Sequence, residues 1–445
     1  MVVDGWLARA AAARPEHTAL QTPTGSWSYA QLHAAALTGA AQLSALGAVP
    51  GAWVAIALPS GLAFAQALHA CLLAGAVAVP LDLRLAPRER ARIAAGCALL
   101  VEQPLADGGR PRPAARAPQA WGHDLDQTAV VIHTSGTTSA PRPVELTYGN
   151  LLWSALGSAV ALGLDPGERW LCALPLSHVG GLSILLRSAI YATTAELHER
   201  FEADRVQHAL RARDVTLVSL VATTLARLLD AGLKRPPALR CALTGGGPVP
   251  GALVARAQAA GVPVGLTYGL TETCSQVTTT PVAEIGSSGA SAGPALFCTS
   301  VRIAADEEIL VRGPTVARGA LSSDGWLHTG DLGSLDERSR LRVTGRKADT
   351  IVTGGENVAP AEVEAVLEAH PRVLEAAVLG RSDPEWGEAV TAIVVPRPGA
   401  ALDAGDLRAH CARTLAPFKV PKRFVLSGER LPRTPSGKLL RRELQ

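Results

Sequence analysis

Short apolar runs alternate with helix-like stretches along most of this 445-residue chain, and this alternation constrains the fold more than any other feature. Four of these runs span residues 53–58, 128–132, 216–221 and 264–267. Apolar runs of this length, separated by helical segments, are typical of parallel sheets covered by helices. The sequence therefore predicts an α/β fold with a large N-terminal domain, residues 1–344, of parallel-rich sheets flanked by helices.

The pattern restarts after residue 345. Helices are expected at 361–369 and 404–414, and strands at 374–379, 389–395 and 423–426. About 100 residues suffice for a compact domain. We therefore expect a small mobile α+β C-terminal domain at 350–445, joined by a hinge at 345–349. A proline-rich stretch at 104–122 without apolar periodicity is expected to be a surface linker.

Composition argues against several classes of protein. With 48% hydrophobic residues the chain can fill sizeable cores, so it is globular and not disordered. The net charge of +3 is too small to attract nucleic acid or an anionic membrane. The longest apolar stretch, 71–81, is well short of the ~20 residues of a transmembrane helix, and Pro80 ends it. We expect no nucleic-acid partner and no membrane insertion.

The cysteines and the N-terminus indicate a cytoplasmic location. The seven cysteines include no CxxC pair and are expected to be reduced, mostly buried thiols, so no zinc site is predicted. The first residues include Asp4 and a short apolar run broken by Arg9, which is unlike a signal peptide.

A hydroxyl-rich turn is expected after the apolar run at 128–132. Residues 133–141 read His-Thr-Ser-Gly-Thr-Thr-Ser-Ala-Pro, and their amides and hydroxyls can wrap phosphate oxygens. The turn does not fit the GxxxxGK[ST] phosphate-binding loop. Taken alone, an ordinary loop is the simpler interpretation.

Three further motifs follow in order: Tyr-Gly-Leu-Thr-Glu-Thr at 268–273, Thr-Gly-Asp at 329–331 and Pro-Ser-Gly-Lys at 435–438. Gly-Arg-Lys-Ala-Asp at 345–349 and Gly-Gly-Glu-Asn at 354–357 lie between the last two. With the turn at 133–141, this series resembles the adenylate-forming ligase superfamily of acyl-CoA synthetases from about residue 6 to the end of the chain. The resemblance implies ATP, Mg²⁺ and coenzyme A, the last as a cosubstrate.

The turn also departs from the family pattern, which continues Gly-x-Pro-Lys-Gly where Ser139, Arg142 and Pro143 stand here. Arg142 keeps a positive charge, whereas Pro143 removes an amide donor and stiffens the chain.

The resemblance also implies which residues contact the nucleotide. Glycine permits close backbone approach to the base, Thr271 contacts phosphate, and the Glu272 carboxylate suits magnesium. Asp331 accepts from the ribose hydroxyls, and Arg346 bridges ribose and phosphate. A plain glycine turn, a surface Glu272 and a surface salt bridge at Arg346 are the alternatives. The implied ATP- and AMP-binding set is Thr134, Ser135, Gly136, Thr137, Thr138, Arg142, Gly245, Gly246, Gly247, Thr267, Tyr268, Asp331 and Arg346, with Glu272 as the metal ligand.

The implied catalytic residues are Lys438, Thr271, Glu272 and His178. Lys438 would neutralise the acid carboxylate and the α-phosphate as they meet, since negative charge accumulates there; the alternative is a solvated lysine near a chain end. The family alternates between two orientations about a hinge, here at Ala348, and the glycines Gly354 and Gly355 would line the coenzyme A channel.

Substrate choice is indicated by residues 174–191 and 271–276, which are similar to the 2-succinylbenzoate–CoA ligases of menaquinone synthesis. If 182–190 is a helix, Ser183 and Arg187 share one face beside His178 and could receive a second carboxylate. The alternative is a snorkelling surface Arg187 and a packed His178. The expected acid-binding residues are His178, Ser183, Arg187, Ser275 and Gln276.

The sequence thus predicts an ATP-dependent ligase that forms an acyl-AMP, with 2-succinylbenzoate as the leading acid, and transfers the acyl group to coenzyme A. Its partners would be a small carboxylic acid, ATP and coenzyme A, and a homo-oligomer is allowed. Three alternatives stay open: a ligase for another aryl or short-chain acid, an adenylating enzyme that loads a carrier protein, and a catalytically weak nucleotide-binding relative.

Overall fold

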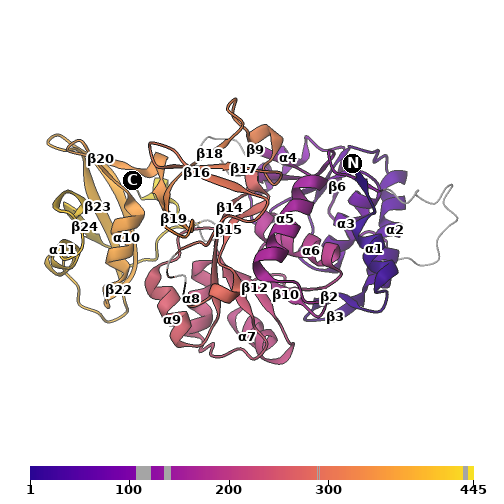
Figure 1. Ribbon diagram of the computed structural model, residues 1–445, viewed down its shortest axis with the longest axis horizontal. Coiled ribbons are helices and arrows are strands. Elements are labelled where there is room, and N and C mark those ends of the chain that lie inside the picture. The colour runs from indigo at the N-terminus through magenta and orange to yellow at the C-terminus, as the bar shows by residue number, and fades with distance from the viewer. Residues whose placement is uncertain (107–121, 135–141, 288, 290, 434–438, 445) are drawn as a thin grey trace.

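The computed structural model describes residues 1–106, 122–134, 142–287, 289, 291–433 and 439–444 (Figure 1). Two large sheets and the helices around them form the larger lobe, and the chain from β20 (Ile351–Thr353) onwards forms a smaller lobe at the left of Figure 1. The α/β class expected from the sequence is confirmed.

The largest sheet has eight strands and carries the region of the predicted nucleotide motifs. Its inner strands are parallel, and only the pairs β14/β15 and β2/β3 are antiparallel. In spatial order the strands are β15 (Ser275–Thr279), β14 (Val264–Leu270), β13 (Cys241–Thr244), β12 (Leu217–Leu220), β10 (Arg169–Cys172), β11 (Thr194–Leu197), β2 (Thr18–Thr22) and β3 (Gly25–Ser28).

A second sheet of five strands packs beside it through a shared helical layer. Its order is β6 (Leu99–Val101), β4 (Trp53–Ile56), β5 (Val77–Pro80), β8 (Thr128–Thr134) and β9 (Arg142–Thr147), with β9 antiparallel to β8. The short strands β1 (Val2–Val3) and β7 (His123–Asp124) form a separate pair.

Helices cover both faces of these sheets. The shared core packs α2 (Tyr29–Ala45), α3 (Leu62–Leu73), α5 (Tyr148–Leu162) and α6 (Val179–Tyr191) between the sheets, with α1 (Trp6–Ala13) at one end. A second core packs α7 (Ala203–Ala212), α8 (Ala222–Asp230) and α9 (Gly251–Ala259) on the far face of the eight-stranded sheet. Helix α4 (Pro87–Ala94) covers the outer face of the five-stranded sheet.

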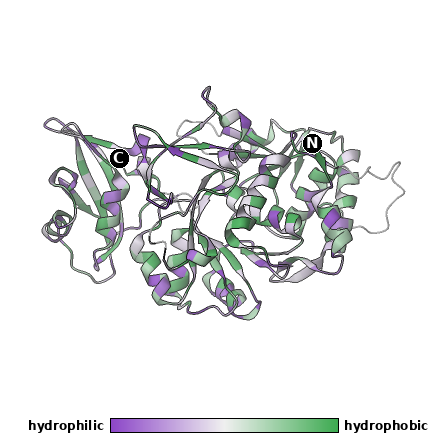
Figure 2. Cartoon of the chain, viewed as in Figure 1, coloured by the Kyte–Doolittle hydropathy of each residue, from purple (hydrophilic) through white to green (hydrophobic). Residues whose placement is uncertain are grey.

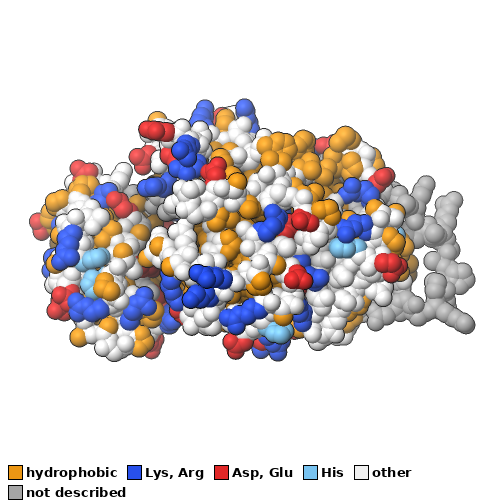
Figure 3. All heavy atoms as spheres, turned by 60° about the horizontal axis from the view of Figure 1, so that its bottom comes forward, with side chains coloured by type: hydrophobic (Ala, Val, Ile, Leu, Met, Phe, Trp, Pro, Cys, Tyr) orange, Lys and Arg blue, Asp and Glu red, His pale blue; other side chains and the backbone are white. Residues whose placement is uncertain are grey.

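Hydropathy explains these positions. Residues 64–73 of α3 are all buried, as expected for a helix that is apolar all round. Figure 2 shows the central strands and helices largely green and the loops more purple. The face in Figure 3 carries Lys and Arg side chains interspersed with Asp and Glu, in keeping with the net charge of +3. Among the described helices, none combines the length and hydropathy needed to cross a bilayer.

One sheet was not expected from the sequence. Strands β16 (Ser300–Ile303), β17 (Glu308–Arg312), β18 (Leu327–Leu335) and β19 (Leu341–Arg346) form an antiparallel sheet between the two lobes. The chain before β20 therefore combines this antiparallel sheet with the two parallel-rich sheets that were expected. The short 3-10 helices are η1 (Thr271–Thr273), η2 (Val282–Glu284), η3 (Arg318–Ala320), η4 (Lys347–Asp349), η5 (Pro417–Lys419) and η6 (Arg441–Glu443).

The smaller lobe is an α+β unit. Its strands are β21 (Glu356–Val358), β20 (Ile351–Thr353), β23 (Gly387–Pro396), β22 (Val373–Asp383) and β24 (Arg423–Leu426), and its helices are α10 (Pro360–Glu368) and α11 (Ala404–Ala412). The bounds of α10, α11, β22, β23 and β24 lie within a few residues of those expected, whereas β20 and β21 were not expected. Most of the expected linker at 104–122 lies outside the described residues.

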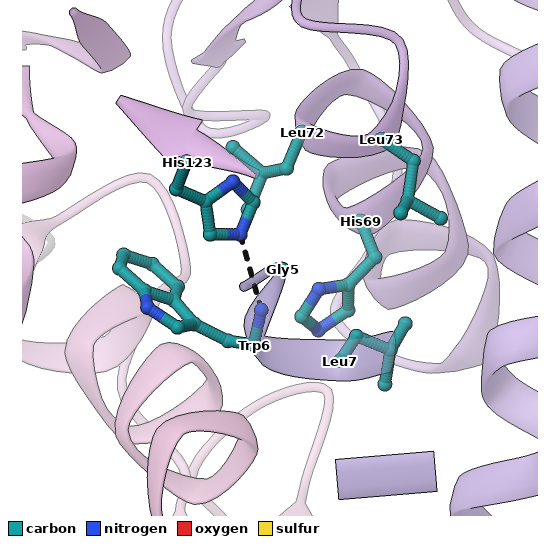
Figure 4. A pocket seen from close by; sticks show the side chains of 7 residues that line it. All are labelled: Gly5, Trp6, Leu7, His69, Leu72, Leu73 and His123. Atoms are coloured by element: carbon teal, nitrogen blue, oxygen red, sulfur yellow. Dashed lines mark hydrogen bonds between the residues drawn. The ribbon is translucent and has the colours of Figure 1, made fainter. Parts of the chain in front are cut away.

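A small cavity beneath α1 contains two buried histidines (Figure 4). The backbone N–H of Trp6 donates to His123 Nε2 at 3.2 Å. Burial lowers the pKa of His69 to about 3 and that of His123 to about 4, so both rings stay neutral near pH 7. The neutral His123 therefore acts as the acceptor that ties the start of α1 to β7.

Candidate active site

The predicted nucleotide residues gather at the carboxyl ends of the parallel strands. The segments after β10 and β13 carry the sequence motifs at 174–178 and 245–247, and the motif at 268–272 spans the end of β14 and the start of η1. In open α/β sheets ligands bind at this edge, because the loops that follow neighbouring strands meet there.

Three positions in these segments require glycine. A Cβ at Gly245 would lie 2.6 Å from the Thr267 carbonyl oxygen, and Gly246 has φ +76°. Gly269 sits at a bulge in β14, where a Cβ would lie 1.5 Å from the Ser275 carbonyl oxygen. A Cβ at Gly247 would meet no described atom within 4 Å.

The 3-10 turn η1 presents Thr271 and Glu272. The Thr273 hydroxyl accepts from the Leu270 N–H at 2.9 Å, and the Glu272 carbonyl accepts from the Ala317 N–H at 2.8 Å. The Glu272 side chain is partly exposed and forms no ion pair within the described part of the chain. A single carboxylate of this kind suits Mg²⁺, which prefers hard oxygen ligands and keeps several waters.

Tyr268, Asp331 and Arg346 are brought together. The Tyr268 hydroxyl donates to Asp331 Oδ2 at 2.9 Å, and Arg346 Nε lies 2.7 Å from Asp331 Oδ1. Burial, followed by the nearby Asp331 carboxylate, raises the pKa of Tyr268, so it remains a donor. Arg346 thus forms the salt bridge that was its alternative interpretation, but with a buried carboxylate that is itself a predicted ribose contact.

The phosphate turn differs from expectation at both ends. Thr134 is the last residue of β8 and pairs with Arg142, the first residue of β9. Pro143 lies opposite His133 in β9 and not in a loop; β9 is an edge strand, where a missing N–H is tolerated. The Arg142 side chain is exposed. The predicted Ser135, Gly136, Thr137 and Thr138 lie outside the described residues.

Arg187 is buried and has no carboxylate partner among the described residues. Its side chain is 3% exposed, and Nη2 donates to Ser154 Oγ at 2.9 Å. The guanidinium lies 5.6 Å from the Trp170 ring centroid, and its Nε has no hydrogen-bond partner in that part of the chain. Burial lowers the pKa of Arg187, yet a guanidinium stays charged in proteins. An unpaired buried charge is unfavourable, so an anionic ligand here would be strongly stabilised.

Other predicted acid-binding residues lie on neighbouring elements. Ser183 is on α6 with Arg187, and Gln276 is on β15, which α6 contacts. Both are buried, and within the described residues Ser183 Oγ and Gln276 Oε1 have no hydrogen-bond partner. Ser275 has φ +94°, an unusual conformation outside glycine.

His178 behaves differently from expectation. It precedes α6, its side chain is 41% exposed, and its Nε2 lies 3.1 Å from Arg84 Nη2 and 3.5 Å from Asp82 Oδ2. The packed His178 and the surface Arg187 offered as alternatives are therefore both wrong. Since α6 rises about 1.5 Å per residue, His178 and Arg187 lie more than two turns apart along the helix and not side by side.

The hinge segment forms ion pairs both with the larger lobe and with the smaller lobe. Ala348 lies within η4; its neighbour Lys347 pairs with Asp306 at 2.6 Å, and Asp349 pairs with Arg441 at 3.4 Å. Gly354 and Gly355 join β20 to β21 with φ +58° and +84°. Lys438 lies outside the described residues.

Sequence reasoning missed Ser154, Asp82 and Arg84. Asn150, Ser154 and Ser158 recur every four residues on the otherwise apolar α5, and this buried polar stripe was the available signal for Ser154. Asp82 and Arg84 follow β5 with no motif of their own, so only the fold brings them to His178.

Comparison with known families agrees with this geometry. Residues 7–321 match the AMP-binding enzyme family, and residues 362–438 match the AMP-binding enzyme C-terminal domain. The chain belongs to the AMP-binding enzyme family. It is 38% identical over 476 residues to the 2-succinylbenzoate–CoA ligase of Bacillus subtilis (strain 168), covering 99% of this chain and 97% of that protein.

The fold of this AMP-binding enzyme is also similar to solved structures of the o-succinylbenzoate CoA synthetase from Bacillus subtilis. The complex with the acyl-adenylate intermediate has a TM-score of 0.91 at 36% identity, covering 100% of this chain and 98% of that one. The complex with ATP and magnesium ion scores 0.90 at 37% identity, covering 100% of both chains. A double mutant bound to its product analogue scores only 0.74 at 37% identity, covering 100% and 99%. The arrangement of this chain is therefore closer to that of the adenylate complex.

Proposed function

We propose that this chain is an AMP-forming 2-succinylbenzoate–CoA ligase of menaquinone biosynthesis. Arg187, which is buried and has no carboxylate partner in the part of the chain that the structure describes, carries the choice of acid, because a charge in that position favours a substrate with a second carboxylate. The full-length likeness to 2-succinylbenzoate–CoA ligases supports the same acid. ATP, Mg²⁺ and coenzyme A are the remaining reactants and cofactor.

In the first half-reaction the acid carboxylate attacks the α-phosphorus of ATP, acyl-AMP forms and pyrophosphate leaves. We assign Tyr268 and the glycine turn to the base, Asp331 and Arg346 to ribose and phosphate, and Thr271 to phosphate. Lys438 would neutralise the two anions as they meet, which lowers the barrier where charge accumulates. Glu272 would hold Mg²⁺, which supplies charge neutralisation to the phosphates.

In the second half-reaction the coenzyme A thiol attacks the acyl carbonyl, the thioester forms and AMP leaves. We assign the glycines at 354 and 355 to the thiol channel and Ala348 to the hinge between an N-terminal domain, 1–344, and a C-terminal domain, 350–445. Because ATP and coenzyme A are cytoplasmic metabolites, we also propose a cytoplasmic location.

A panel of acids tests the proposal. Pyrophosphate release is measured with 2-succinylbenzoate, with analogues that lack either carboxylate and with short-chain acids, and products are identified by mass spectrometry with coenzyme A or a carrier protein. We expect release and a coenzyme A thioester with 2-succinylbenzoate above all others. Preference for a monocarboxylate, or transfer only to a carrier protein, would contradict the proposal.

A further inference from the structure

One hydroxyl group joins the acid-binding region to the nucleotide turn. Ser154 of α5 is 2% exposed; its Oγ accepts from Arg187 Nη2 at 2.9 Å and donates to the Cys274 carbonyl oxygen at 2.6 Å. A serine hydroxyl has a single proton to donate, so its orientation is fixed by the carbonyl and leaves lone pairs for the guanidinium.

The carbonyl that Ser154 holds belongs to the strained end of the nucleotide turn. Cys274 has φ +53° and Ser275 has φ +94°, two consecutive non-glycine residues in the left-handed region. The Cys274 N–H donates to the Thr271 carbonyl at 3.0 Å and closes the turn that presents Thr271 and Glu272. Residues in such conformations persist where surrounding contacts over-determine them, and the bond from Ser154 is one of those contacts.

The other partner, Arg187, is the group most affected by a bound anion. Its described polar contact is Ser154, and Trp170 lies against the guanidinium. Any movement of the guanidinium towards a carboxylate changes the bond that Ser154 accepts, and hence the position of the carbonyl to which Ser154 donates. The two sites therefore share one atom, Ser154 Oγ.

We propose that Ser154 is a positioning residue that couples binding of the substrate's second carboxylate at Arg187 to the nucleotide turn at Thr271 and Glu272. This inference rests on the proposed function. Coupling between sites is reciprocal, so the dicarboxylate should change the affinity for the nucleotide by the same factor as the nucleotide changes the affinity for the dicarboxylate.

The test measures the dissociation constant of a non-hydrolysable ATP analogue with Mg²⁺ by calorimetry, alone, with saturating 2-succinylbenzoate, and with an analogue that lacks the second carboxylate. In the wild-type chain we expect the dicarboxylate to tighten nucleotide binding roughly five- to tenfold more than the monocarboxylate does. In Ser154→Ala the two acids should tighten nucleotide binding by the same factor, so that their ratio falls to about one, because the hydrogen bond to the Cys274 carbonyl is gone. A purely structural defect would instead weaken nucleotide binding equally under all three conditions.

Ser158→Ala is the matched control, since Ser158 lies one turn further along α5 and is equally buried. It should retain the wild-type difference. If the alanine variant does not fold, Ser154→Cys replaces it, because cysteine has nearly the same volume but forms only weak hydrogen bonds. It should also lose the ratio between the two acids.

One contrary outcome is the same ratio between the effects of the two acids on nucleotide affinity in the wild type and in Ser154→Ala. If the wild type also converts 2-succinylbenzoate to its thioester, that result would overturn this inference alone. Absence of that conversion in the wild type would overturn the proposed function and this inference with it.

Discussion

At the residue scale, Arg187 combines a functional role with an unfavourable environment. Arg187→Leu removes a buried charge that lacks a carboxylate partner among the described residues, so the melting temperature should hold or rise. The same change should raise the KM for 2-succinylbenzoate by about 10- to 100-fold, the scale of a charged hydrogen bond of about 1.5 to 3 kcal/mol. Monocarboxylate kinetics should change little. Steady-state kinetics with both acids, together with thermal unfolding, check these expectations.

Arg240→Leu is the contrasting variant. Arg240 pairs with Glu168, which is 2% exposed, so its removal leaves a buried carboxylate with the Thr216 hydroxyl but no charged partner among the described residues. Loss of one partner of a buried pair typically destabilises by about 3 to 5 kcal/mol, and the ratio of KM values for the two acids should not change. If Arg187→Leu raises the KM for both acids equally, Arg187 does not bind the second carboxylate.

Glu368 introduces a pH dependence into the smaller lobe. Burial, and then the nearby Glu364 carboxylate, raise the pKa of Glu368 from 4.5 to about 7. The folded state therefore binds more protons than the unfolded state between pH 4.5 and 7, and its stability falls as pH rises through that window. In the wild type the free energy of unfolding should fall by roughly 1 to 3 kcal/mol between pH 5 and 8, and Glu368→Gln should abolish this fall.

Denaturant unfolding of the smaller lobe, followed by hydrogen exchange of α10 at pH 5.5 and pH 8, measures this effect. Glu362→Gln on the same helix is the control, because Glu362 is exposed and pairs with Lys419. A wild-type chain whose α10 is equally stable at both pH values would contradict the prediction.

At the element scale, the turn between β20 and β21 has a strict conformational demand. Gly354 and Gly355 both have positive φ, as a two-residue type I′ hairpin turn requires. A Cβ at Gly355 would meet no atom of the described residues within 4 Å, whereas one at Gly354 would lie 3.1 Å from the Trp386 ring. Gly355→Asn should therefore be tolerated, Gly355→Ala should destabilise by about 1 kcal/mol or more, and Gly354→Ala should be worse. Thermal unfolding of the three variants gives the order.

The elements also show what could be predicted from the sequence. The apolar cores of β4, β8, β12 and β14 were evident because buried parallel strands are continuous apolar runs. The sheet β16–β19 was not, since its outer strands have half-exposed, mixed patterns that read as loop. Arg187 was placed on its helix, but its burial depends on α5 and β15, which are distant in sequence. For the same reason the local sequence pattern could not predict the hydrogen bonds of Ser154 to Arg187 and Cys274.

At the scale of the whole molecule, the two half-reactions should be separable by variants on either side of the hinge. The arrangement of this chain, closer to the adenylate complex than to the product-analogue complex, is the one in which we expect Lys438 to act. Lys438→Ala should lose acyl-AMP formation by ~100-fold or more, the scale of one preorganised charge at a transition state. It should still convert supplied acyl-AMP and coenzyme A to thioester.

Gly355→Leu should show the opposite phenotype, because its side chain would block the thiol channel only in the second orientation. It should form acyl-AMP and release pyrophosphate but stall before thioester, while Gly355→Asn, which tolerates positive φ and is smaller, should complete both steps. Pyrophosphate release and thioester yield, measured separately on each folded variant, distinguish the outcomes. If Lys438→Ala and Gly355→Leu lose the same half-reaction, domain alternation does not gate this enzyme; if they lose opposite ones, the conformational change itself orders the chemistry.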